Sequence, residues 1–433
     1  MEHRVGETPR TEELSDAEAR VRRLSGAAMI ALVVAVALAT FIGAGLGEPI
    51  DPAVAAGDAP RLGGDFPAFY GAGSIFWDGE FDVLYDADRQ ELAQVGLGID
   101  GYLAFAYPPH VAAGYAPLGA LPFQLSYFIH TALMAGAFIG ALGLLSPVVP
   151  LVKRWRIPLT AAGFTFYPLG IAIGGGQNAS LTVLGLAAVW RGLHDDREWL
   201  AGLAAGLMMY RPQYALPVIG LMLLSRHFKA VGWAGATTVV TWAGTAAVFG
   251  ASWLTDWFET VLPFVERDAE VNAQNSISAL GFFQAAFSVD STFALVIGFA
   301  IAATVVLTLM GLWIQPDRFT LADRMGALAI GSLLISPHTN FYDAALLVIA
   351  AIAILARHDR ETAPIGLLVI GWIAVLVHPL TDGVRATPLA IVVFGAFVAM
   401  VAACVTAPSQ TVESRAGDPS TFDGVDRELV NNA

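Results

Sequence analysis

The amino-acid sequence predicts an all-α protein that crosses a lipid bilayer about ten to twelve times. Of its 433 residues, 56% are hydrophobic and 14% are charged, whereas soluble domains carry about 25% charged residues. Apolar runs of about 20 residues recur from Gly26 almost to Thr406, and each is long enough to cross the hydrocarbon core as a helix. Helices are expected because backbone polar groups in lipid must be satisfied within their own segment.

Polar residues divide the chain into three parts. Residues 1–25 are mixed in charge and are expected in the cytoplasm, residues 26–406 form the transmembrane domain, and the acidic tail 407–433 is expected to be disordered. Residues 48–103 hold eleven acidic and two basic residues, so most of the net charge of −14 belongs to one loop. No basic stripe is present to neutralise phosphates, which argues against a nucleic-acid partner. The single cysteine, Cys404, excludes an intramolecular disulfide.

Lysine and arginine residues in short loops set the orientation of the spans, because they favour the cytoplasmic side. Arg20, Arg22 and Arg23 place the N-terminus inside, so a first span over 26–47 leaves the acidic first loop, 48–103, outside. A second span over 123–146 returns to Lys153 and Arg154 inside. The further expected spans cover residues 158–174, 177–192, 231–250, 289–313, 325–337, 341–356, 363–379 and 387–406.

Two segments are too irregular for ordinary spans. Residues 199–225 are too few for two full spans, and Arg211-Pro212 lies at their middle, so we expect two half-helices that meet near the outer side of the membrane. Residues 104–122 are apolar but contain four prolines. Irregular backbone at membrane depth must be buried in protein or line a cavity. This segment is therefore expected to form a re-entrant element.

The unusual polar residues fall on one side of this topology. Placing a charge at the bilayer centre costs about 2.5 to 3.5 kcal/mol on insertion scales, so each charged residue there needs a partner or a wet cavity. The residues expected at the outer face are Asp65, Gln177, Asn178, Arg211, Gln213, Asn275, His338, Asn340, Asp343, His378 and Asp382. Their convergence predicts a polar site on that face.

Asp65 lies in the stretch GGDFPAFY, and two interpretations of it stay open. It is either a turn former after Gly63-Gly64 or a general base. An ionised carboxylate can accept the proton of a hydroxyl group as that oxygen attacks, which contributes about 10² to 10⁴ in rate. The neighbouring Phe66 and Phe69 would then supply a wall for a sugar ring.

Arg211 and His338 carry the remaining chemistry. Arg211 lies inside the apolar stretch MMYRPQY, where it forms either a buried ion pair or a fixed cation for the phosphate of a lipid substrate. His338 follows Pro337 in SPHTNFYD and either ends a helix or donates a hydrogen bond to a leaving oxygen. Asp343, five residues later, is expected to orient that imidazole.

Weaker signals come from Tyr107 and His110 in YPPH and from Gln177 and Asn178 in GQN, for which packing and turn roles are the alternative. With Gln213, Asn275, Asn340 and Asp343, they are candidate substrate-binding residues. The glycosylation sequon at Asn178 is discounted, because such three-residue matches are frequent by chance. No P-loop, dinucleotide fingerprint or zinc-protease motif occurs in a supporting context.

Five segments together resemble glycosyltransferase family 87. They are, in order, GGDFPAFYGAG, AYPPHVAAGYAPLGALP, GQNASLTVLGLAAVWRG, REWLAGLAAGLMMYRPQYALPVIGLMLLSRHFKAV and SPHTNFYDAALLVIA, between residues 63 and 356. The resemblance implies a GT-C-like bundle, that is, a multi-span inverting transferase that takes sugar from a polyprenyl-phosphate donor outside the cytoplasmic membrane. It implies mannose as the sugar and a glycolipid or glycan as the acceptor. Neither a metal nor another cofactor is implied.

Site roles follow from the same resemblance. The acidic residue of the family's first outer loop matches Asp65 as general base, and the late histidine after Ser-Pro matches His338. The cation before proline in the half-helix region, often lysine in the family, matches Arg211, so the charge is kept while the donor geometry changes. The loop around Asn275 matches the family only loosely.

Two other classes of function remain as alternatives. A translocase or binding protein for lipid-linked sugars also needs outward polar residues and half-helices, and an acyl or phosphoryl transferase would use a similar site. Transporters often show repeated halves and polar residues along a whole path. Here the polar residues gather on one face and no repeat is visible, which favours chemistry on that face.

Overall fold

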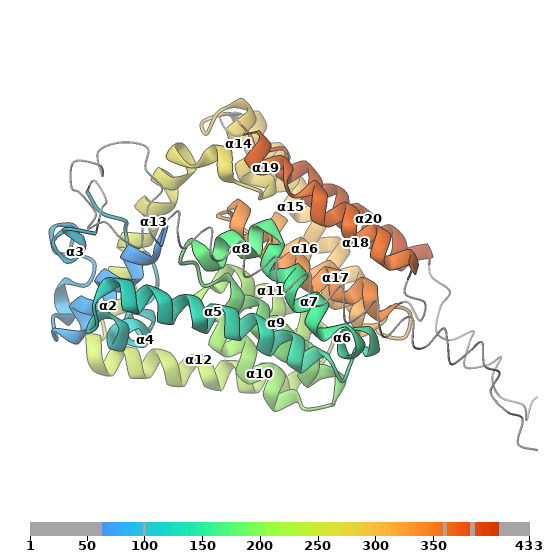
Figure 1. The fold of residues 1–433 in the computed structure, drawn as a ribbon, viewed down its shortest axis with the longest axis horizontal. Coiled ribbons are helices and arrows are strands. Elements are labelled where there is room, and N and C mark those ends of the chain that lie inside the picture. Colours follow the sequence, from blue (N-terminus) through green and yellow to red (C-terminus); the bar gives the residue numbers. More distant parts are fainter. Residues whose placement is uncertain (1–62, 98–100, 358–361, 382–385, 407–433) are drawn as a thin grey trace, which may run out of the picture.

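The computed structural model describes residues 63–97, 101–357, 362–381 and 386–406, and its regular structure is helical (Figure 1). No strand forms in these ranges; an isolated antiparallel bridge joins Ser276 and Asn340. The prediction of an all-α polytopic membrane protein is confirmed. The N-terminal segment 1–25, the first span 26–47, Asp382 and the tail 407–433 lie outside the described residues.

The helices follow the expected order. Those of the first loop and of the segment after it are α2 (Phe66–Trp77), η1 (Phe81–Val83), α3 (Ala87–Gln94) and α4 (Pro109–Gly119). The next are α5 (Phe123–Leu145), α6 (Pro150–Arg154), α7 (Arg156–Thr165), α8 (Tyr167–Gly174), α9 (Ala179–His194), α10 (Glu198–Leu207), η2 (Met208–Tyr210), α11 (Pro212–Leu224) and α12 (Phe228–Phe249). The last are α13 (Trp253–Val271), η3 (Ala273–Asn275), α14 (Ala279–Phe287), α15 (Thr292–Trp313), α16 (Leu321–Ile335), η4 (Phe341–Leu346), α17 (Leu347–Ala356), α18 (Thr362–Ala374), α19 (Val377–Leu380) and α20 (Leu389–Thr406).

Length and composition make three of the described helices able to span a membrane: α5, α15 and α20. A fourth is counted if α7 and α8, which meet at a bend of 72°, form one span. Further apolar helices are shorter, such as Pro212–Leu224, Phe341–Ala356 and Leu368–Leu380. Ten to twelve crossings therefore stay a prediction.

Helix breaks occur at Arg211 and between α7 and α8, and the sequence predicted only the first of them. The half-helices expected around Arg211 are confirmed, because α10 and η2 end there and α11 starts at Pro212. Residues 158–174, expected as one span, form two helices, α7 and α8, with a bend between them that was not expected. Phe166 adopts an extended conformation between α7 and α8, and Pro168 is in the first turn of α8, where a missing N–H does no harm.

Buried apolar side chains form two clusters. The larger one joins α5 to α9–α11 and α15–α20 and is the core of the bundle. The smaller one joins α2, α4 and the start of α5 around Phe66, Phe69 and Tyr115. Segment 104–122, the expected re-entrant element, thus places its helix α4 against α2. Gly73 and Gly119 allow the two backbones to meet, since a Cβ at Gly119 would lie 2.2 Å from the Ser74 nitrogen.

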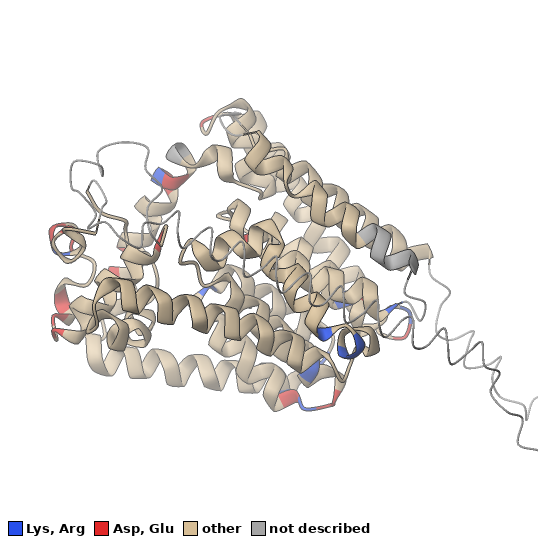
Figure 2. Cartoon of the chain, in the orientation of Figure 1, with Lys and Arg blue, Asp and Glu red and all other residues tan. Residues whose placement is uncertain are grey.

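Charges separate along the long axis of the molecule (Figure 2). Acidic residues gather at the end that holds the first-loop helices, while basic residues gather toward the opposite end, at α6 and the last turn of α9, with some acidic residues in the α9–α10 connection. This separation agrees with the topology that the lysine and arginine residues predict.

Candidate active site

Asp65 is held between two glycine turns. Gly63 and Gly64 have φ angles of 84° and 51°, in the left-handed region that glycine adopts without cost. The amide nitrogen of Asp65 donates to the carbonyl oxygen of Gly175 over 2.9 Å. A Cβ at Gly64 would lie 2.6 Å from that same oxygen, so the two turns meet backbone to backbone.

The side chain of Asp65 does not cap the helix that follows it. Asp65 is at the N-cap position of α2 without a side-chain hydrogen bond to that helix. Its Oδ2 instead accepts a hydrogen bond from Nε2 of Gln177, which follows the second glycine turn. The aspartate is therefore part of a turn, as one interpretation expected, while its carboxylate is directed toward the polar cluster.

Arg211 is at the centre of that cluster. The break between η2 and α11 places its guanidinium in the protein interior, where the residue is 4% exposed. Nη1 donates to Oδ1 of Asp343 over 2.5 Å, and Nη2 donates to the Tyr107 hydroxyl over 3.0 Å and to Oε1 of Gln177 over 3.3 Å. Nε is buried without a hydrogen-bond partner in the described structure.

The buried ion pair expected as one interpretation of Arg211 is thus present, and its partner is Asp343. That finding corrects the role expected for Asp343, which does not orient His338. Oδ2 of Asp343 accepts from the Asn340 amide over 3.3 Å and so caps η4. Both oxygens are committed to holding Arg211 and the start of η4 in place.

His338 pairs with a residue that sequence reasoning missed. Nδ1 of His338 lies 3.0 Å from Oδ2 of Asp268, near the end of α13. Burial alone would raise the pKa of Asp268, but hydrogen bonds from His338 and Asn272 hold that pKa below its ordinary value. The acidic stretch ERDAE gave no signal that singled out Asp268, because four of its five residues are charged.

The loop before α14 is attached to the turn that carries His338. The amide of Ile277 donates to the Thr339 carbonyl over 2.9 Å, beside the Ser276–Asn340 bridge. Asn275 lies half-buried at the end of η3, next to this attachment. Asn340 extends its own side chain to the Tyr342 hydroxyl, 3.3 Å away. Tyr342 lies close enough to Asp65 to interact with its charge.

Other expected residues have structural surroundings. Asn178 is 1% exposed, which agrees with discounting its sequon. Gln213 is half-buried on the first turn of α11 and makes no side-chain hydrogen bond within the described ranges. His110 lies on the first turn of α4 with Nδ1 buried and unpaired there. His378 stacks on Phe341, with ring centres 4.2 Å apart.

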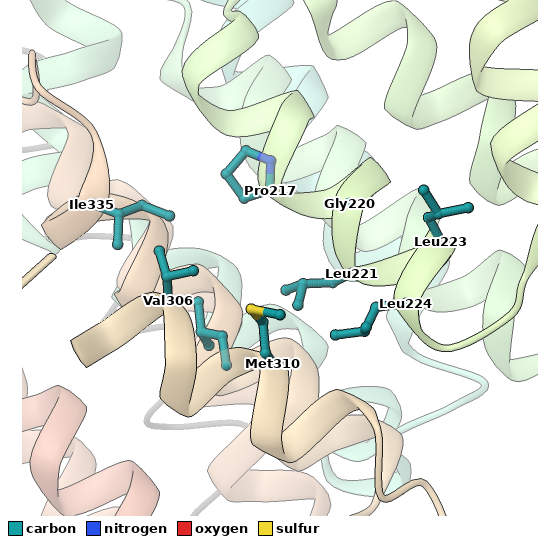
Figure 3. Close-up of a pocket in the computed structure, with 9 residues that line it drawn as sticks. Pro217, Gly220, Leu221, Leu223, Leu224, Val306, Met310 and Ile335 are labelled. Carbon is teal, nitrogen blue, oxygen red and sulfur yellow. The ribbon is translucent and has the colours of Figure 1, made fainter. Parts of the chain in front are cut away.

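An apolar groove runs along the same half-helix that starts after Arg211 (Figure 3). Its volume is about 370 Å³. It lies between α11 and α15, with one residue from the end of α16. The lining residues are Pro217, Gly220, Leu221, Leu223, Leu224, Val306, Leu309, Met310 and Ile335. Among the described residues, no group of three or more His, Cys, Asp or Glu side chains is arranged to hold a metal ion.

Comparison with known families decides the class of this protein. The model of glycosyltransferase family 87 matches residues 105–337, more than half of the chain. The chain belongs to glycosyltransferase family 87. The match includes Tyr107, Gln177 and Arg211, ends one residue before His338 and does not reach Asp65. It is shorter than the resemblance between residues 63 and 356.

One curated relative of this family 87 protein is the polyprenol-phosphate-mannose-dependent alpha-(1-2)-phosphatidylinositol pentamannoside mannosyltransferase of Mycolicibacterium smegmatis. The two sequences are 28% identical over 234 residues, which cover 53% of this chain and 55% of the relative. The match thus spans about half the length of the relative. No solved structure matches the chain significantly.

Proposed function

We propose that this family 87 protein is a hexosyltransferase that moves mannose from a polyprenyl-phosphate donor to a glycolipid or glycan acceptor, with inversion at the anomeric carbon. The donor class and the sugar are those in the name of the curated relative. The reaction takes place on the extracytoplasmic face of the plasma membrane, the inner membrane where two are present. The separation of acidic and basic ends supports this orientation.

One observation carries the proposal: the side-chain amide of Gln177 bonds to a carboxylate at one end and to a guanidinium at the other. Asp65 and Arg211 both hydrogen-bond to Gln177. A single displacement needs a base for the attacking hydroxyl and a positive charge for the departing phosphate. The cluster provides one of each.

The residues divide the reaction as follows. Asp65 takes the proton from the acceptor hydroxyl while that oxygen forms a bond to the anomeric carbon. The bond from that carbon to the phosphate oxygen breaks, and polyprenyl phosphate leaves with the electron pair. Arg211 stabilises its charge, and the unpaired Nε of Arg211 is a donor that a phosphate oxygen can use. In its doubly protonated form, with Nδ1–H toward Asp268, His338 donates to the leaving oxygen through Nε2–H.

The groove on α11 supports a lipid-linked donor. It is apolar and belongs to the half-helix that follows Arg211, so a phosphate at the guanidinium would have an isoprenoid path beside it. Inside a bilayer the lipid tails are as apolar as the groove, so close van der Waals packing of the chain against the groove is what holds it there. A groove of this size would therefore hold part of the donor by its chain and leave the sugar at the polar cluster.

The test is a transfer assay with the purified full-length protein, a panel of polyprenyl-phosphate sugars and glycolipids extracted from membranes. We expect release of polyprenyl phosphate and a labelled glycolipid with the mannose donor. Donor binding without release for every sugar in the panel would overturn the proposal and favour a translocase or binding protein. Asp65→Asn protein, prepared in parallel, controls for contaminating transferases.

A further inference from the structure

Gln177 contacts both residues on which the proposed transfer depends. Its Nε2 donates to Oδ2 of Asp65, and its Oε1 accepts from Nη2 of Arg211 over 3.3 Å. Only one orientation of the amide fits, because an NH₂ group must face the carboxylate and an oxygen must face the guanidinium. The residue is 5% exposed, and both of its side-chain heteroatoms are engaged. It is therefore poorly suited to the substrate-binding role expected from sequence.

We propose that Gln177 is a positioning residue that sets the distance between the base and the phosphate-binding cation. This inference rests on the proposed function. The base must reach the acceptor hydroxyl while the cation reaches the leaving phosphate, and a misplacement of about 1 Å can cost about 10² in rate. One amide that bonds to both groups fixes their separation without touching substrate.

The backbone around Gln177 is fixed as well. Its amide nitrogen donates to the Ala172 carbonyl over 2.8 Å. Gly176 before it has a φ angle of 71°, and a Cβ there would lie 2.4 Å from the Gly63 carbonyl oxygen. Because the turn of Gln177 and the turn of Asp65 are packed together in this way, the amide is held on a rigid frame.

Replacement by glutamate separates positioning from packing. Gln177→Glu keeps the shape and the acceptor for Arg211 but replaces the donor to Asp65 with a second carboxylate. Two carboxylates at one site resist ionising together, so the acid limb of the pH–rate profile should move to higher pH. The ionisable groups around this position are Asp65, Tyr107, His130, Tyr210, Arg211, Tyr342 and Asp343.

The experiment compares wild type, Gln177→Glu and Gln177→Met by kcat, by KM for the polyprenyl-phosphate-mannose donor and by the pH dependence of kcat/KM. Gln315→Glu, an exposed change after α15, is the matched control. We expect an alkaline shift of the acid limb in Gln177→Glu only. In Gln177→Met we expect kcat to fall at least tenfold, with KM changed less than threefold.

The outcomes separate this inference from the proposed function. If wild type transfers sugar and Gln177→Glu keeps the wild-type pH profile and kcat, Gln177 is a packing residue and the inference fails alone. If Gln177→Glu does not fold, the kcat and KM of Gln177→Met decide, and a wild-type kcat overturns the inference. If wild type transfers no sugar from any donor, the proposed function itself fails.

Discussion

Asp268 near the end of α13 lies 3.0 Å from the His338 imidazole, so α13 is attached to the turn that precedes η4. Residues 70 positions apart in the sequence thereby share one hydrogen bond. Because one partner is a carboxylate, this hydrogen bond makes the stability of the folded protein depend on pH.

Protonating Asp268 should weaken this attachment. The folded-state pKa of Asp268 is below its ordinary value, so its contribution to stability is complete above about pH 4, the unfolded value, and is lost as the pH falls through the folded value. We expect Asp268→Asn to lower the melting temperature at pH 6, which corresponds to a loss of about 1 to 3 kcal/mol in the free energy of unfolding, and to have a smaller effect at pH 3. Asp256→Asn, an exposed change on the same helix, is the control. Equal destabilisation at both pH values would contradict this account.

Asp65→Asn should separate folding from proton transfer. Asparagine forms turns as well as aspartate does and can still accept the hydrogen bond from Gln177, but it cannot take a proton at neutral pH. We expect donor binding and the melting temperature to survive while turnover falls by about 10² or more. Release of polyprenyl phosphate measures turnover. If turnover of Asp65→Asn is within a few fold of wild type, Asp65 has a structural role only.

Arg211 has a structural and a proposed catalytic role, and a double variant separates them. Arg211→Ala leaves Asp343 buried without its partner, which should destabilise the protein by about 3 to 5 kcal/mol. Adding Asp343→Asn removes the stranded charge, so we expect the double variant to recover part of the melting temperature without recovering donor binding. Arg211→Lys should keep part of the activity because the charge survives. If the double variant binds the donor as tightly as wild type does, Arg211 serves only in the ion pair and does not bind the donor phosphate.

The groove is tested by filling it. A Cβ at Gly220 meets nothing within 4 Å, so Gly220→Phe should fold and occupy the groove. We expect KM to rise about tenfold for a long-chain polyprenyl donor and little for a short-chain analogue, since the ring excludes the chain from its many small packing contacts in the groove. Gly232→Phe on α12 also points into open space and is the control. An equal rise in KM for both donors would show that the donor chain does not occupy this groove.

Reporter fusions test the orientation of the chain. Fusions at residues 90 and 270 should report outside, and fusions at 154, 228 and 320 should report inside, because the lysine and arginine residues favour the cytoplasm. A cytoplasmic signal at residue 90 would put Asp65 on the wrong face for the proposed reaction.

Local signals predicted much of the fold. Apolar runs predicted α5 and α15 to within a few residues of their ends, and Arg-Pro in an apolar stretch predicted the break before α11. Pro168 gave a comparable signal for the bend between α7 and α8, but the hydropathy of the flanking residues concealed it.

The residues of the site were easier to foresee than their pairing. Arg211 and His338 are conspicuous because charge or imidazole in an apolar context is costly. Their partners are far away in sequence: Asp343 is 132 residues from Arg211, and Asp268 is on a helix with several acids. Which carboxylate meets which cation depends on how the helices pack, and periodicity along the chain does not contain that information.

The meeting of the two glycine turns limits how this protein can be re-engineered. A methyl group at Gly64 or Gly176 would collide with a carbonyl oxygen of the opposite turn, at 2.6 Å and 2.4 Å respectively. Libraries that vary sugar preference should therefore leave both turns untouched. Tyr107 and Tyr342 border the same cluster through their side chains, by hydrogen bonds from Arg211 and Asn340, so new shapes and polarity are better introduced at these two positions.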